Sequence, residues 1–168
     1  MKLNAKSIAL MSMLITLSVV SRIALIIIPN VQATTVVIIL SSFILNPVGA
    51  VIVAVGSVLV SNLILGMGIW TLWQILAWSL IGLASGLVGK YHKKLPLIII
   101  ALYAGLCGLA FGFLISIPMI PMIGSVTGFW IYYLAGLPFD IAHAIGNTIF
   151  MYLLYPVFFK IINKHKRL

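Results

Sequence analysis

The stretch GMGIWTLWQILAW, residues 66–78, gathers three tryptophans, a threonine and a glutamine at the junction of two hydrophobic runs. On an ideal helix Trp73, Gln74 and Ala77 share one face. Aromatic faces beside a single amide suit the binding of a planar, partly polar small molecule. The alternative is a belt of tryptophans at a membrane surface, which forms whatever the protein does. A belt gives no role to Thr71 or Gln74, and an unpaired Gln is costly in lipid.

The composition around this stretch indicates a membrane protein. The chain has 168 residues, of which 64% are hydrophobic and 7% are charged, whereas about 25% charged residues are usual in soluble domains. One carboxylate, Asp140, stands against ten Lys and Arg residues. The basic residues cluster at helix ends and form no stripe on a polar fold, so a membrane is favoured over nucleic acid as the partner. A single cysteine, Cys107, rules out an internal disulfide.

The breaks between apolar runs predict an all-α membrane protein, a compact bundle of six transmembrane helices in a single domain, residues 1–168. The expected helices cover residues 6–28, 34–45, 48–65, 70–88, 97–117 and 138–162. The run 34–45 is short for a straight span, so it is expected to tilt, break or sit partly inside the bundle. Residues 118–137 are expected to form an ordered loop with a short interfacial helix. The first run is too long for a signal peptide, whose apolar core is about 7–15 residues.

The basic residues also predict an orientation. Six alternating spans put both termini and the loop 90–94 on one side, and that side holds every Lys and Arg except Arg22. The positive-inside rule therefore predicts cytoplasmic N- and C-termini. The tryptophan-rich stretch, the turn after the first helix and the segment 118–137 then face outward.

A second group of polar residues opens the last helix. Asp140, His143 and Asn147 follow i, i+3, i+7 spacing and share one face, which must point to protein, water or ligand. An interhelical hydrogen-bond network is the alternative. Arg22 and Asn62 add polar groups inside helices near the same membrane face. No second His or Cys stands at ligand spacing, so no metal site is predicted.

Arg22 is the basic residue that lies within a span, and Asp140 is the one carboxylate. Lone charges at such depth are costly, so we expect the two to pair directly or to share a polar ligand.

Two alternatives of other classes remain at this point. A small intramembrane enzyme could use His143 and Asp140, although one carboxylate cannot supply the usual acid and base pair. A purely structural membrane subunit is the other. The chain has no phosphate-binding glycine loop, so no ATP site is predicted within it. Ala5 and Ala9 form a small-xxx-small pattern that permits close approach of another helix.

The chain resembles the substrate-binding S-component of energy-coupling factor (ECF) vitamin transporters. The similarity covers essentially the whole chain and is closest to the cobalamin branch, while other branches take queuosine precursors, riboflavin or pantothenate. It is carried by Pro29-Asn30-Val31, by Trp70-Thr71-x-Trp73-Gln74, and by Leu137-Pro138-Phe139-Asp140-x-x-His143-x-x-x-Asn147.

The resemblance implies a high-affinity binding subunit in the plasma membrane of a prokaryote, with no catalytic activity and no cofactor of its own. It implies a transmembrane T-component and two cytoplasmic ATPase subunits as partners, with Ala5 and Ala9 docking the T-component. The expected solute-binding residues are Arg22, Asn30, Asn62, Trp70, Thr71, Trp73, Gln74, Asp140, His143 and Asn147.

Overall fold

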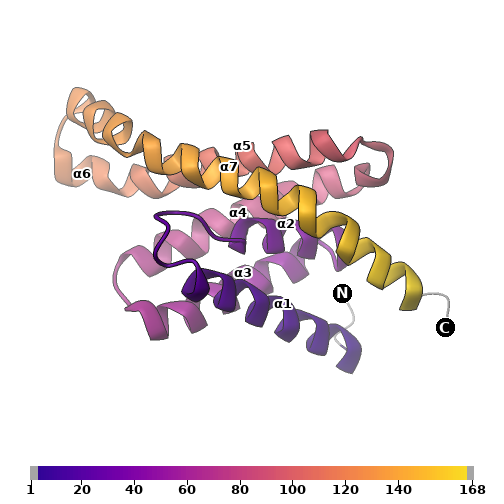
Figure 1. Ribbon diagram of the computed structural model, residues 1–168. Helices are drawn as coiled ribbons and strands as arrows, with labels where there is room; N and C mark the ends of the chain where they lie inside the picture. Colours follow the sequence, from indigo (N-terminus) through magenta and orange to yellow (C-terminus); the bar gives the residue numbers. More distant parts are fainter. Residues whose placement is uncertain (1–3, 166–168) are drawn as a thin grey trace.

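The computed structural model describes residues 4–165, with side chains described as far as Ile162. All regular elements in this range are helical (Figure 1). They are α1 (Ala5–Ala24), α2 (Thr34–Ile44), α3 (Pro47–Leu65), α4 (Trp70–Gly89), η1 (His92–Lys94), α5 (Leu97–Ser116), η2 (Ile117–Met119), α6 (Ile120–Ile123) and α7 (Val126–His165).

Five of these helical segments are long and apolar enough to cross a membrane, which supports the predicted multi-pass membrane protein. They are Ala5–Ala24, Pro47–Leu65, Trp70–Gly89, Leu97–Ile123 and Val126–Ile162. The remaining apolar helix, α2, is shorter and has 11 residues. At a rise of about 1.5 Å per residue it is only about 16 Å long, roughly half the thickness of the hydrocarbon core.

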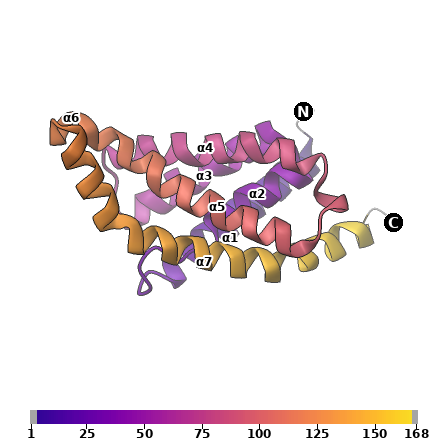
Figure 2. The same cartoon turned by 90° about the horizontal axis from the view of Figure 1, so that it is seen from above.

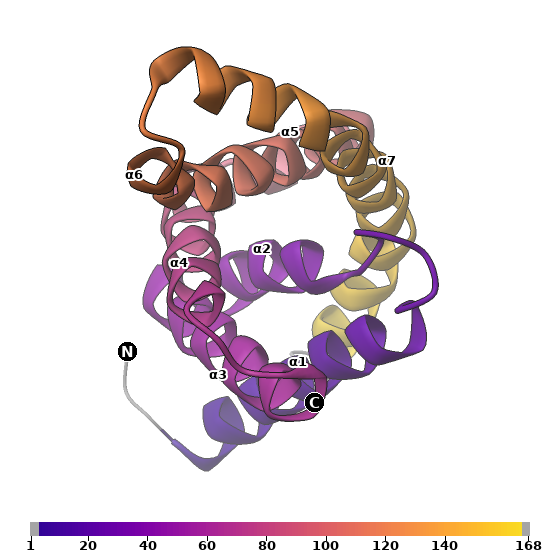
Figure 3. The ribbon, with the colours of Figure 1, turned by 90° about the vertical axis from the view of Figure 1, so that its left-hand side faces the viewer.

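The short helix α2 lies at the centre of the bundle. Figure 3 shows the longer helices arranged around it, and α2 contacts α1, α3, α4, α5 and α7. All side chains from Thr34 to Ser42 are buried. Of the three alternatives for this short run, the structure shows the one in which the run sits inside the bundle. Continuous hydrophobicity here reflects a helix enclosed by protein on every side.

The first and last helices differ from the sequence prediction. The helix α1 ends at Ala24, four residues before the expected end at Ile28, and residues 25–28 close in turns. The nearby Pro29 has no N–H and disfavours helical conformation in the residue before it, so the chain leaves the helix early. Asn30 then adopts a left-handed conformation with φ 61°, which asparagine tolerates better than most residues.

The predicted loop over 118–137 is wrong, because most of the segment is helical, although a short helix, α6, does lie within it as expected. After Gly124 turns the chain with φ 73°, the hydroxyl of Ser125 accepts a hydrogen bond from the Gly128 N–H, and α7 begins at Val126. Pro138, expected at the start of the last helix, lies inside α7. A proline inside a helix removes one hydrogen bond and bends the helix without necessarily ending it. Figures 2 and 3 show that α7 curves, with its first part turned across the end of the bundle.

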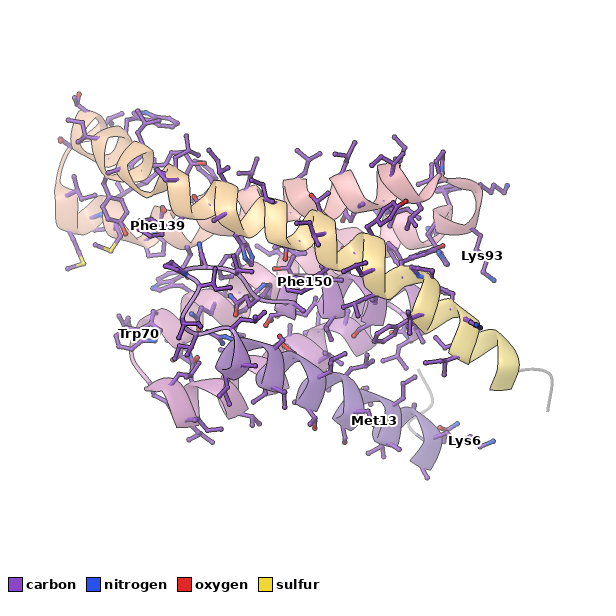
Figure 4. The ribbon with its side chains drawn as sticks, in the orientation of Figure 1. Lys6, Met13, Trp70, Lys93, Phe139 and Phe150 are labelled. Atoms are coloured by element: carbon purple, nitrogen blue, oxygen red, sulfur yellow. The ribbon has the colours of Figure 1, made fainter. Side chains whose placement is uncertain are left out.

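Lysines and tryptophans occupy opposite ends of the bundle. In Figure 4, Lys6 and Lys93 lie at one end, and Trp70 and Phe139 lie at the other. We call these the lysine end and the tryptophan end.

At the lysine end, the His92 ring packs against Phe43, with centroids 4.8 Å apart, and against Phe159 at 4.7 Å. Its Nδ1 lies 2.9 Å from the Tyr155 hydroxyl. Burial, with a further effect of Lys93, lowers the pKa of His92 below its usual range. An uncharged His92 can therefore hold the η1 turn against α2 and α7.

Glycines let α5 and α7 approach closely along most of their shared length (Figures 1 and 2). A Cβ atom on Gly105 or Gly108 would press on Ala144 of α7, and one on Gly112 would collide with the Asp140 carboxyl group. Small residues at a helix crossing increase van der Waals contact where lipid supplies no hydrophobic driving force. This crossing fixes the position of the polar residues that α7 carries.

The α5–α7 crossing gives a stability prediction. We expect Gly108→Ala to lower the thermal unfolding midpoint of the detergent-purified chain, because its Cβ would lie 3.0 Å from backbone atoms of Ala144. Overpacking of this kind typically costs about 1–3 kcal/mol. Gly136→Ala is the matched control, since no atom lies within 4 Å of its added Cβ. Equal midpoints for the two variants would contradict the tight crossing.

Candidate functional site

The tryptophan-rich stretch folds into the first two turns of α4, and its polar residues face α3. The Asn62 amide donates hydrogen bonds to Thr71 Oγ1 at 2.9 Å and to Gln74 Oε1 at 2.8 Å. Thr71 also accepts a bond from the Gly68 N–H at 3.3 Å, which ties the turn between α3 and α4 to the same group. The structure therefore brings together Asn62, Thr71 and Gln74, three of the residues that the sequence predicts to bind a solute.

Two tryptophans of the same stretch face away from this polar group. Trp70 and Trp73 line a cavity of about 360 Å³ at the tryptophan end. Its other walls come from the residues before α4 and from α5, η2, α6 and α7. They are Ile69, Ile115, Pro118, Met119, Met122 and Tyr132. The cavity is thus aromatic and methionine-rich, with Gln74 next in sequence to one of its tryptophans.

Arg22, in the last turn of α1, joins the Asn62 group from the other side. Its Nη1 donates to Ser61 Oγ at 2.6 Å and to Asn62 Oδ1 at 3.2 Å. Its guanidinium carbon lies 5.2 Å from the centre of the Trp78 ring, within cation–π range. The direct pairing of Arg22 with Asp140 predicted from the sequence is not among the ion pairs or hydrogen bonds of the described residues. Neutral acceptors and an aromatic face hold the cation instead.

A buried hydrogen-bond chain lies between Trp78 and the loop before α2. The Trp78 Nε1–H donates to Thr35 Oγ1 at 2.9 Å. Thr35 Oγ1 lies 3.0 Å from His143 Nε2, and His143 Nδ1 lies 2.7 Å from the Asn30 carbonyl oxygen. A carbonyl can only accept, so Nδ1 carries the proton and Nε2 accepts from Thr35. This assigns a neutral His143 whose two ring nitrogens are both occupied by protein groups.

Asn30 anchors the loop between α1 and α2. Its side-chain amide donates to the Phe139 carbonyl at 3.1 Å, while its own carbonyl accepts from His143. Deeper in the bundle, Ser18 donates to the first residue of α2, Thr34, at 3.1 Å. Ser18 lies six residues before the last residue of α1, Ala24. At about 1.5 Å per residue, α2 therefore begins about 9 Å below the tryptophan end of α1.

The remaining predicted residues of α7 have fewer partners. Asp140 is 7% exposed, abuts Gly112, and forms no side-chain hydrogen bond within the described residues. Asn147 is fully buried beside Gly108, and neither atom of its amide has a partner there. Asp140, His143 and Asn147 thus lie on the buried side of α7, as predicted, but only His143 belongs to a hydrogen-bond network.

Three further residues of the site escaped sequence reasoning. Ser61 and Thr35 are hydroxyl residues in apolar runs, and their roles depend on partners distant in sequence. Trp78 is fully buried, stacked on Phe111 with centroids 4.2 Å apart, unlike a tryptophan at a membrane surface. On an ideal helix Trp78 does not share a face with Trp73. That difference was the signal in the sequence that Trp78 has another role.

The residues predicted to dock the T-component lie away from these polar groups and from the aromatic cavity. Ala5 and Ala9 are exposed on α1, toward the lysine end.

The chain matches no known family model, no curated protein and no solved structure. Within the described residues, no group of three His, Cys, Asp or Glu side chains is placed to hold a metal ion.

The buried chain through Thr35 gives a second prediction. Thr35→Val keeps the side-chain volume but leaves the Trp78 N–H and His143 Nε2 without their partner. An unsatisfied buried group costs about 1–3 kcal/mol, so the thermal unfolding midpoint should fall. Thr16→Val is the control, because Thr16 is exposed and bonds only the Ser12 carbonyl. A control that loses as much stability as Thr35→Val would show that the buried chain contributes nothing specific.

Proposed function

We propose that this protein is the membrane-embedded binding subunit of an ATP-driven uptake system for a vitamin-like solute. The observation that carries the proposal is the cavity lined by Trp70 and Trp73. The hydrogen-bonded group of Asn62, Thr71 and Gln74 lies nearby at the junction of α3 and α4 and does not line the cavity. An apolar, aromatic cavity beside a few fixed polar groups is the usual form of a small-molecule site.

The size of the cavity bears on the solute. Ligand pockets usually have volumes of about 300–1,000 Å³, and the cavity of about 360 Å³ is near the lower limit. A single planar ring system, as in a queuosine precursor or a flavin, is of suitable size. Cobalamin, the solute of the branch that the sequence most resembles, is far larger and would have to extend beyond this cavity.

The proposed orientation places the lysine end in the cytoplasm and the tryptophan end outside, following the positive-inside rule. The cavity would then open toward the external solution of a prokaryotic plasma membrane. Because the sequence contains no nucleotide-binding loop, ATP hydrolysis is assigned to two cytoplasmic ATPase subunits, coupled through a transmembrane T-component. The exposed Ala5 and Ala9 on α1 are the proposed contact with the T-component.

The geometry around His143 argues against acid–base catalysis, and equally against direct contact of its ring nitrogens with a solute. A general base must reach its substrate through a free ring nitrogen. Both nitrogens of His143 contact protein groups, and the side chain is fully buried. The Asp140 carboxyl group forms no hydrogen bond with His143 in the structure, so no acid–base pair is assembled.

The binding proposal is tested by exchanging tryptophans. Solutes released from the detergent-purified chain are identified by mass spectrometry, and their affinity is measured by calorimetry. We expect Trp73→Ala to weaken binding several-fold, because aromatic stacking contributes about 0.5–1.5 kcal/mol beyond buried area. Trp130→Ala is the matched control, since Trp130 is exposed on α7 and does not line the cavity. Normal solute binding by Trp73→Ala would indicate that the tryptophans form only an interfacial belt and not a binding site.

The proposed orientation is tested by thiol labelling in intact cells. The native Cys107 is buried, and Cys107→Ala gives a background without thiols. In that background Ser125→Cys should react with an impermeant reagent, whereas Lys93→Cys should react only after the cells are opened. Both positions are exposed on the protein, so burial does not explain a difference. The reverse pattern would refute the orientation.

A further inference from the structure

Among the residues that the structure describes, the guanidinium of Arg22 has no anionic partner. Its two contacts through Nη1 are to a hydroxyl and an amide oxygen, and its third neighbour is the Trp78 ring. The chain contains a single carboxylate side chain, Asp140, which forms no ion pair with Arg22 in the described residues. Arginine stays charged in proteins. Arg22 lies in the last turn of α1, which ends at Ala24, and an unpaired charge within a membrane span is costly.

Most of the N–H donors of Arg22 also form no hydrogen bond within the described residues. A guanidinium has five N–H donors, and the structure uses only those of Nη1. Nε and Nη2 have no acceptor among the described residues. They form the side of the fork that can bind a carboxylate or phosphate through two parallel hydrogen bonds.

A small cavity with both polar and apolar walls adjoins this residue, and its apolar lining consists of Leu25, Ile26, Ile28, Val31 and Leu65. It has a volume of about 170 Å³, and Arg22, Asn30 and Gln32 supply its polar side chains. A water molecule occupies about 30 Å³ in the liquid, so the cavity has room for a group of the size of a carboxylate or phosphate. Two hydrogen bonds through Asn62 connect Arg22 to Gln74, the neighbour of Trp73 in sequence. Arg22 therefore lies at the same end of the bundle as the aromatic cavity.

We propose that Arg22 binds an anionic oxygen group, a carboxylate or a phosphate, and that the solute of this protein carries that group. The solute part of this inference rests on the proposed function. The anion supplies the charge that the sequence lacks, accepts hydrogen bonds from Nε and Nη2, and discriminates against neutral analogues. A site built to bind a polar group rejects an analogue without it, because its buried donors are then left unpaired.

The local site is tested with minimal anions. The whole chain is purified in an uncharged maltoside detergent, and its unfolding midpoint is measured with increasing sodium phosphate or acetate at constant ionic strength. Wild type should be stabilised with saturation by at least one of the two anions. In Arg22→Gln the half-saturating concentration should rise about tenfold or more, as expected for loss of a charged hydrogen bond. Lys6→Gln is the control, because it removes the same charge from the same helix at the lysine end.

Two results would overturn the anion site. One is no saturable stabilisation of wild type by either anion. The other is equal stabilisation of wild type and Arg22→Gln. If Arg22→Gln does not fold, Arg22→Lys takes its place, since it keeps the charge but lacks the planar fork. We then expect weaker binding than in wild type, and unchanged affinity would overturn the two-point contact.

Co-purified molecules separate the possible sources of the anion. Mass spectrometry of wild type and Arg22→Gln should find a water-soluble carboxylate or phosphate compound that is retained by wild type and by Lys6→Gln but lost from Arg22→Gln. A phospholipid with this behaviour would assign the site to a lipid headgroup and overturn the solute assignment. A neutral solute bound equally by all three chains would overturn the inference while supporting the proposed function. Anion binding that depends on Arg22 without any bound or transported solute would leave the anion site standing and refute the proposed function.

Discussion

The arrangement of this protein depends on the complete burial of one short helix. The side chains from Thr34 to Ser42 have no contact with the surroundings of the bundle, because α1, α3, α4, α5 and α7 enclose α2. Backbone polar groups in a membrane must be satisfied internally, and a helix achieves this within itself even when it is too short to span. Since α2 begins about 9 Å below the end of α1, the chain at residues 25–33 must descend into the bundle. That descent brings polar residues from four elements together near one end.

The polar contacts at this depth hold the elements in register. Trp78, Thr35, His143 and Asn30 connect α4, α2, α7 and the loop in one sequence of donors and acceptors. In a medium of low dielectric constant such a chain is favourable only when every member is satisfied. These hydrogen bonds therefore specify a single relative position for the four elements, whereas apolar contacts alone would let the helices slide past one another. Asn147, with both amide atoms unpaired, is a departure from this rule.

Local signals in the sequence were sufficient to predict the helices whose ends are marked by chain-breaking residues. The expected helices 48–65 and 70–88 agree within one residue with Pro47–Leu65 and Trp70–Gly89, because asparagine, proline and glycine mark their ends. Pro138 misled the prediction, since proline can begin a helix or lie within one, and in the structure it lies inside α7. The site was predictable where partners are close in sequence, as for Asn62 and Gln74. The roles of Thr35 and Ser61 depend on residues 108 and 39 positions away, and no local pattern encodes those contacts.

The shortage of acidic residues links the composition of the chain to its site. In most membrane proteins a cation inside a span pairs with an acidic residue or lines an aqueous path. In this protein a hydroxyl, an amide oxygen and an aromatic ring surround Arg22, and these hold the side chain in place without cancelling its charge. A bound anion would cancel that charge, so ligand binding and stability must be coupled: whatever binds the folded state alone raises its free energy of unfolding. Arg22 is held by hydrogen bonds through Nη1, at one edge of its guanidinium. Fixing that edge in advance reduces the entropy lost when the other edge binds.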